Sequence, residues 1–211
     1  MRESMVISWA EFLPMVVVIS ASGVMSPGPL TFATIASGSK RGWKAGPSIG
    51  LGHLIVELPL VFVIAMGATF ISSIDLRWVS LGGGLFMVIF GFLTVRGARG
   101  AGKEGTVSRL SGHPVMVGVG LSSLNPYFLV WWATVGAPLV IIGMEIAGMF
   151  GVGVMFTSHI WLDFLWLTVL AFLGSRGKKL GRFYPYFVAG LGIALVVFGI
   201  AFMVRAFYGL S

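Results

Sequence analysis

Two pairs of ionisable side chains lie in the middle of long apolar stretches, where charged groups are rare. His53 precedes Glu57 by four residues, and His159 precedes Asp163 by the same spacing. Residues four apart share one face of an α-helix, so the members of each pair can interact. A charge at the centre of a bilayer costs at least ~2.5–3.5 kcal/mol, so both pairs should face protein or water. There they could relay protons, hold the ammonium group of a substrate or bind a cation.

The residue types alone leave three interpretations of these pairs open. The first is substrate binding or proton coupling. The second is a metal site, because two imidazoles and two carboxylates form a four-ligand set suited to zinc or manganese. The third is a satisfied polar contact that fixes one helix against another without any part in function. The metal ligands in the second interpretation would be His53, Glu57, His159 and Asp163.

Two proline motifs interrupt the apolar stretches and suggest a second kind of site. They are Ser26-Pro27-Gly28-Pro29 and Asn125-Pro126. Proline cannot donate a helical hydrogen bond, and the residue before it avoids helical geometry. A helix broken in this way is tolerated in a bilayer only where protein or a water-filled cavity receives its backbone polar groups. The plainer alternative is a proline kink in a packed helix.

A half-helix that begins after the first proline motif would present its positive N-terminal end to the cavity. Such an end is suited to a carboxylate, because its first N–H groups have no partner within the helix. Thr31 could add a hydroxyl group to this site.

Composition indicates that membrane helices position these residues. The chain is 57% apolar and 10% charged, whereas soluble domains carry about 25% charged residues. Several apolar runs reach the ~20 residues that cross a hydrocarbon core. We predict an all-α membrane protein with six transmembrane helices, of which helices 1 and 4 are broken at proline. The predicted spans are residues 9–38, 47–70, 78–95, 113–143, 145–174 and 184–207.

The distribution of basic residues predicts the orientation of these spans. The loops after spans 1, 3 and 5 carry Lys40, Arg41, Lys44, Arg96, Arg99, Lys103, Arg109, Arg176, Lys178, Lys179 and Arg182. The remaining three of the 14 basic residues are Arg2, Arg77 and Arg205. Cytoplasmic loops are enriched in Lys and Arg, so both termini should lie outside a plasma membrane. This topology also accounts for the net charge of +7, so no nucleic-acid partner is expected.

The two halves of the chain carry matching motifs in the same order. The His/acid pair occurs in spans 2 and 5, and a proline motif occurs in spans 1 and 4. Span 3 matches span 6 at Gly82, Gly84, Val88, Phe90 and Gly91, which correspond to Gly190, Gly192, Val196, Phe198 and Gly199. Because each half has three spans, the second must be inverted, as in many secondary transporters. We expect one transporter domain, 1–211, with repeats at 9–95 and 113–208 and a linker at 96–112.

Tryptophans and glycines allow simpler interpretations. Trp131, Trp132, Trp161 and Trp166 are predicted to anchor the membrane interface, although a ligand cation could also stack on an indole. The glycines of spans 3 and 6 should permit close helix packing, either within one chain or in a homodimer.

The chain resembles the LysE/RhtB family of amino-acid exporters. The resemblance rests on the first proline motif, on Gly42-x-x-x-Gly46 followed by Gly50 and His53, and on Asn125-Pro126. It covers essentially the whole chain and implies export of amino acids or related solutes, with the broken helices near the site. The acid and histidine pairs in both halves depart from the commoner exporters. They look closer to a less characterised branch with a Gly-His-x-x-x-Glu motif.

We therefore predict a secondary active exporter of amino acids or related small zwitterionic solutes, coupled to protons. The alternative is a divalent metal-cation exporter, and a third hypothesis is an intramembrane metalloenzyme. No His-Glu-x-x-His pattern supports an enzyme, and no cofactor is expected. The candidate substrate-binding or proton-coupling residues are Ser26, Pro27, Gly28, Pro29, Thr31, His53, Glu57, Asn125, Pro126, His159 and Asp163.

Overall fold

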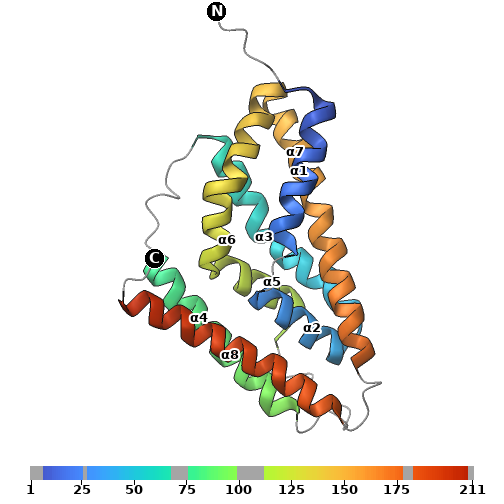
Figure 1. Cartoon of the computed structure of the whole chain (residues 1–211), viewed down its shortest axis with the longest axis vertical. Helices are drawn as coiled ribbons and strands as arrows, with labels where there is room; N and C mark the ends of the chain where they lie inside the picture. Colours follow the sequence, from blue (N-terminus) through green and yellow to red (C-terminus); the bar gives the residue numbers. More distant parts are fainter. Residues whose placement is uncertain (1–6, 26–27, 68–75, 99–111, 178–182, 209–211) are drawn as a thin grey trace, which may run out of the picture.

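Every element of the described chain is helical, which confirms the all-α prediction. The computed structural model describes residues 7–25, 28–67, 76–98, 112–177 and 183–208 (Figure 1). Its helices are α1 (Trp9–Val24), α2 (Pro29–Arg41), α3 (Ala45–Ala65), α4 (Leu76–Ala98), α5 (Pro114–Ser123), α6 (Pro126–Trp131), the π-helical turn η2 (Trp132–Gly136), α7 (Ala137–Arg176) and α8 (Tyr184–Tyr208).

Three stretches of the described chain are long and apolar enough to cross a membrane. They are Ala45–Ala65, Tyr127–Arg176 and Ala189–Tyr208. A fourth candidate is the bent pair formed by α1 and α2. The fold is therefore that of a multi-pass membrane protein, while the arrangement of six spans stays a prediction.

The first predicted break separates α1 from α2. Their axes differ by 73°, and α2 begins at Pro29 after Gly28 in extended geometry. Proline suits the first position of a helix because its missing N–H would have no partner there. Ser26 and Pro27 lie outside the described residues.

The second predicted break separates α5 from α6, which begins at Pro126. Asn125 caps α6, because its side-chain oxygen accepts a hydrogen bond from the backbone N–H of Tyr127 at 3.1 Å. The π-helical turn η2 follows directly, and such turns are frequent at functional sites.

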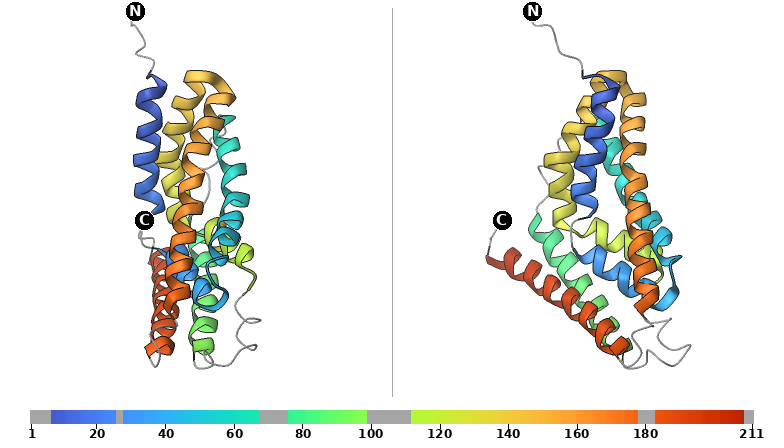
Figure 2. Two further views of the ribbon diagram at one scale, coloured as in Figure 1. Left: turned by 90° about the vertical axis from the view of Figure 1, so that its right-hand side faces the viewer. Right: turned by 45° about the vertical axis from the view of Figure 1, so that its right-hand side comes forward.

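Helix α7 reverses direction near its first quarter, so its two arms lie side by side (Figures 1 and 2). The reversal occurs at Ala147 and Gly148, which have non-helical backbone angles, and Gly148 has a φ of +59°. The predicted spans 4 and 5 therefore meet a few residues later than expected. Proline marks a break in a sequence, whereas this turn depends on a glycine in left-handed geometry.

Helices α4 and α8 pack along each other and lie obliquely across the lower part of the molecule in Figure 1. A Cβ atom on Gly84 would clash with the carbonyl of Gly199, and one on Gly91 would clash with the carbonyl of Gly192. These glycines permit close packing within the chain, so they give no support to a homodimer. Small residues serve the same purpose at other membrane-helix contacts.

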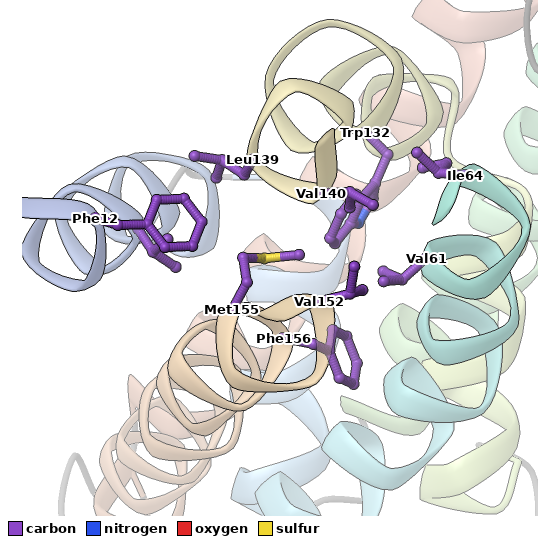
Figure 3. Packing of buried hydrophobic residues seen from close by; sticks show 10 residues of the cluster. Phe12, Val61, Ile64, Trp132, Leu139, Val140, Val152, Met155 and Phe156 are labelled. Carbon is purple, nitrogen blue, oxygen red and sulfur yellow. The ribbon is translucent and has the colours of Figure 1, made fainter. Parts of the chain in front are cut away.

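Two apolar clusters form the core. Figure 3 shows the first cluster, which joins α1, α3, η2 and both arms of α7. Its buried members are Phe12, Val16, Val61, Ile64, Trp132, Leu139, Val140, Val152, Met155 and Phe156. The second cluster contains Ala33, Ile49, Met87, Val117, Leu121, Leu167, Leu170, Leu195 and Phe202.

A polar layer separates the two clusters. Along α3, Ile49 belongs to the second cluster and Val61 to the first, with His53 and Glu57 between them. Along α7 the order is reversed, and the other His/acid pair again falls between the clusters. The fold therefore places both pairs at one level.

Candidate functional site

The two predicted pairs meet in one buried ring of four side chains. His53 Nε2 lies 3.2 Å from Glu57 Oε1 and 3.7 Å from Asp163 Oδ1. His159 Nε2 lies 3.1 Å from Glu57 Oε1 and 3.3 Å from Asp163 Oδ2. Each imidazole therefore faces both carboxylates. We call these four residues the His/carboxylate ring; all four side chains are at most 8% exposed.

Two serines are hydrogen-bonded to the histidines of the ring. The Nδ1 atom of His53 is hydrogen-bonded to Ser122 Oγ at 2.7 Å, and that of His159 to Ser20 Oγ at 2.8 Å. Both serines are buried. Sequence reasoning missed them, because a serine in an apolar helix usually bonds to a carbonyl of its own helix and gives no distinguishing signal.

The serine bonds are reciprocal between the two halves of the chain. Ser20, in the half 9–95, pairs with His159, whereas Ser122, in the half 113–208, pairs with His53. Four helices therefore meet at the ring: α1, α3, α5 and α7.

Trp132 adds a donor to one side of the ring. Its Nε1–H donates to Glu57 Oε1 at 3.1 Å, and its side chain is buried. A Cβ on Gly136 would clash with this indole, so the glycine that ends η2 leaves room for it. The prediction that Trp132 anchors the membrane interface was wrong, because helix α6 and η2 turn this side chain inward.

The other three tryptophans divide between the site and the surface. Trp131 stacks on the His159 ring, with centroids 5.5 Å apart and planes at 28°, and lines the cavity, while its anchoring role stays a prediction. Trp166 lines the cavity described below. Trp161 is 47% exposed, and its anchoring role stays a prediction.

Three buried polar atoms near the ring have no hydrogen-bond partner among the described residues. They are Glu57 Oε2, Asp163 Oδ2 and Trp166 Nε1. The Asp163 oxygen lies 3.3 Å from His159 Nε2 but is not hydrogen-bonded to it. Buried polar atoms seldom lack a hydrogen-bond partner, so a proton, cation or substrate group would satisfy them.

A cavity of about 660 Å³ opens beside the ring. All four ring residues line it, as do Gly28, Pro29 and Thr31 of the first break and Asn125 of the second. The structure thus brings together most of the predicted site residues. Pro126 begins α6 next to Asn125.

The cavity lining combines acidic and aromatic groups. Glu57 and Asp163 supply its acidic groups, while Phe128, Trp131 and Phe198 contribute aromatic surface. Among its described lining residues there is no Lys or Arg. A negatively charged group entering the cavity would therefore meet N–H and hydroxyl donors or an imidazole rather than a lysine or arginine side chain.

The ring can be tested as a metal site by its donor set. Single ligand atoms of His53, Glu57 and Asp163 lie within 4.8 Å of one another. This set fits a divalent cation that accepts imidazole and carboxylate ligands. However, the closest N···O contacts, at 3.1 and 3.2 Å to Glu57 Oε1, are hydrogen-bond distances, so protons alone account for the ring on its Glu57 side.

Helical described elements with a polar ring beside a cavity between them are typical of membrane transporters. Within that class, the family described as LysE type translocator matches residues 21–206, so the chain belongs to this family. Membership suggests an exporter of amino acids or related solutes. The resemblance seen in the sequence is thereby confirmed, while the narrower branch stays a prediction. Searches of curated proteins and of solved structures each found no match.

Proposed function

We propose that the protein is a secondary active exporter of amino acids or related small zwitterionic solutes, coupled to protons. One observation carries the proposal: the same cavity is lined by the N-terminus of α2 and by two buried carboxylates. A zwitterion needs both kinds of partner. A purely cationic or anionic solute would use only one of them.

The carboxylate of the substrate is assigned to the N-terminus of α2. This helix has no acidic residue in its first turn, and Gly28 carries no side chain that could cap it. Backbone N–H groups at a helix N-terminus attract anions. Thr31 lies in the same turn and lines the cavity.

The ammonium group and the protons are assigned to the His/carboxylate ring. Two carboxylates between neutral imidazoles carry a charge of −2, which two protons neutralise. An unneutralised charge in a buried site is strongly disfavoured. An entering ammonium group therefore replaces a proton, and this exchange couples solute export to proton entry.

We further propose the predicted six-span inverted repeat, which would support alternating access around the ring. Two contact patterns favour it. The serine–histidine bonds are reciprocal between the halves, and so are the contacts of Gly84 with Gly199 and of Gly91 with Gly192. A pseudo-twofold axis generates reciprocal contacts of this kind.

The proposed orientation places both termini outside the plasma membrane. The chain contains no cysteine, so an introduced one is the sole thiol. Lys44, which precedes α3, and Ala147, at the reversal of α7, are both exposed. The junction of α2 with α3 and the reversal of α7 lie at opposite ends of the bundle (Figure 1). In intact cells a membrane-impermeant maleimide should label Ala147→Cys but not Lys44→Cys. The opposite pattern would reverse the topology.

Transport in proteoliposomes tests the main proposal. An imposed pH gradient should drive amino-acid movement in the parent protein and should fail to do so in the double variant Glu57→Gln, Asp163→Asn. Equal gradient-driven transport by parent and variant would contradict proton coupling at the ring. Absence of transport for every amino acid would contradict the substrate class.

A divalent-cation exporter is the second candidate, because the ligand atoms of His53, Glu57 and Asp163 lie close together. Thermal unfolding of the purified protein separates the two functions. A cation exporter should be stabilised by low concentrations of Zn²⁺ or Mn²⁺, and His53→Ala should abolish that effect. An amino-acid exporter should be stabilised by an amino acid, also after chelation.

A further inference from the structure

We infer that Ser20 and Ser122 are positioning residues of the proton-coupling site, each orienting a histidine that belongs to the other half of the chain. The inference rests on the proposed function, because it assigns a role at the same ring. Its geometric basis is the pair of hydrogen bonds from Ser20 to His159 and from Ser122 to His53.

A serine hydroxyl can serve an imidazole in both of its protonation states. A neutral imidazole has one N–H donor and one acceptor nitrogen, whereas the charged form has two donors. When the serine O–H donates to Nδ1, the proton of the neutral ring is on Nε2, which faces the carboxylates. When the histidine gains a second proton, the same serine oxygen accepts from Nδ1–H. Neither nitrogen is then left without a partner in a buried site.

The hydroxyl group therefore fixes which nitrogen presents its N–H to the two carboxylates. The partner of one ring nitrogen sets the role of the other. Nε2 of His159 faces Glu57 and Asp163, and Nε2 of His53 faces the same two carboxylates. The titratable groups around each imidazole thus come from α3 and α7, while α1 and α5 contribute the serines.

Packing at these contacts does not depend on the two hydroxyls. Helices α3 and α5 approach closely at Gly52 and Gly118, and α1 meets α7 through Phe12, Val16 and Met155 in the first apolar cluster. Replacement of serine by alanine removes one oxygen and leaves these contacts in place. A loss of function in the alanine variants would therefore report on the histidines.

Neighbouring serines give matched controls. Ser123 is adjacent to Ser122, and its hydroxyl donates to the carbonyl of Val119 in its own helix. Ser158 is adjacent to His159, and its hydroxyl donates to the carbonyl of Val154. Alanine at either control position removes a local hydrogen bond without touching a ring histidine.

The first test is the pH profile of gradient-driven transport in proteoliposomes. Ser20→Ala and Ser122→Ala should each lower the maximal rate about three- to tenfold and displace the profile by about half to one pH unit, as expected for the loss of one hydrogen bond. Ser20→Thr and Ser122→Thr, which keep the hydroxyl, should restore the parent profile. An unchanged profile in both alanine variants, or an equal change in Ser123→Ala and Ser158→Ala, would overturn the inference.

The second test does not need a known substrate. In the parent protein labelled with ¹⁵N-histidine, the spectra of His53 and His159 should show the tautomer protonated at Nε2 when the imidazoles are neutral. Ser20→Ala should alter the signals of His159 alone, and Ser122→Ala those of His53 alone. The inference would be overturned if the neutral imidazoles of the parent were protonated at Nδ1, or if the histidine signals did not change on replacement of the paired serine. These spectra separate failure of the serine assignment from failure of the proposed transport function.

Discussion

Glu57 and Asp163 occupy equivalent positions in the His/carboxylate ring, but they differ in the hydrogen-bond donors that contact them. Each carboxylate lies four residues after a histidine, and each of these histidines is bound by a serine from the other half of the chain. Glu57 Oε1 also accepts hydrogen bonds from Trp132 and His159. One oxygen of each carboxylate, Glu57 Oε2 or Asp163 Oδ2, has no hydrogen-bond partner among the described residues, so the two carboxylates differ in the donors at Glu57 Oε1. Similar halves have thus produced two unlike carboxylates.

The difference suggests a division of roles within the proposed exporter. Hydrogen bonds from N–H donors stabilise a charged carboxylate, and Glu57 has more of them. Asp163 can exchange a bound proton for an ammonium group more easily, because fewer hydrogen bonds to its carboxylate would have to break. We expect Glu57 to stay a fixed counter-charge, while Asp163 binds the proton or the ammonium group in turn.

The largest expected effect is on stability, at Glu57. Glu57→Gln removes a buried charge from a site with several donors and should lower the free energy of unfolding by about 3–5 kcal/mol. Asp163→Asn should cost clearly less. Thermal or denaturant unfolding of both variants in detergent measures the difference. If Asp163→Asn proves as destabilising as Glu57→Gln, the two carboxylates are equivalent and the comparison fails.

The next effect comes from Trp132, whose indole distinguishes the two sides. Trp132→Phe keeps an aromatic ring but removes the N–H that donates to Glu57, so stability should fall by about 1.5–3 kcal/mol, the range for a hydrogen bond to a charged group. In this background the stability costs of Glu57→Gln and Asp163→Asn should become more alike. A double-mutant cycle measures the change. If the difference between the stability costs of Glu57→Gln and Asp163→Asn stays the same in the Trp132→Phe background, Trp132 does not cause that difference.

Asp163→Asn should act mainly on coupling. We expect gradient-driven export to fall about ten- to a hundredfold, equivalent to the loss of one charge-assisted hydrogen bond in transport. Exchange of labelled amino acid at equal pH should persist, because the Asn carbonyl oxygen still accepts a hydrogen bond from the ammonium group and exchange needs no net proton movement. Proteoliposome counterflow checks this point. Loss of exchange and export together would assign Asp163 to substrate binding alone.

The smallest expected effect is at Trp131, whose indole stacks on the imidazole of His159 and makes no hydrogen bond to the His/carboxylate ring that the structure shows. Trp131→Phe preserves an aromatic surface against His159 and should change stability by only about 0.5–1 kcal/mol. Unfolding measurements beside those of Trp132→Phe provide the control. A larger effect at Trp131 than at Trp132 would mean that stacking, rather than the indole N–H, sets the difference between the two sides.

Features that depend on local sequence were predicted well. Proline fixed the breaks before α2 and α6, because it cannot join a helical ladder. The reversal at Ala147 and Gly148 was placed only approximately, because the presence of a glycine in a sequence does not show whether its backbone has a positive φ. Trp132 was misassigned as an interface anchor because an apolar sequence does not reveal which side of a helix faces the protein.

By itself, the sequence determined the apolar helices, the proline breaks and the presence of two His/acid pairs, each on one helix face. These follow from composition, from proline chemistry and from contacts four residues apart. Only the tertiary structure decided that the pairs form one ring, that Ser20 and Ser122 hold it, and that Trp132 distinguishes Glu57 from Asp163. The hydrogen bonds responsible join residues 69, 75, 102 and 139 positions apart. Such contacts depend on how the helices pack around the ring, which no local pattern in the chain specifies.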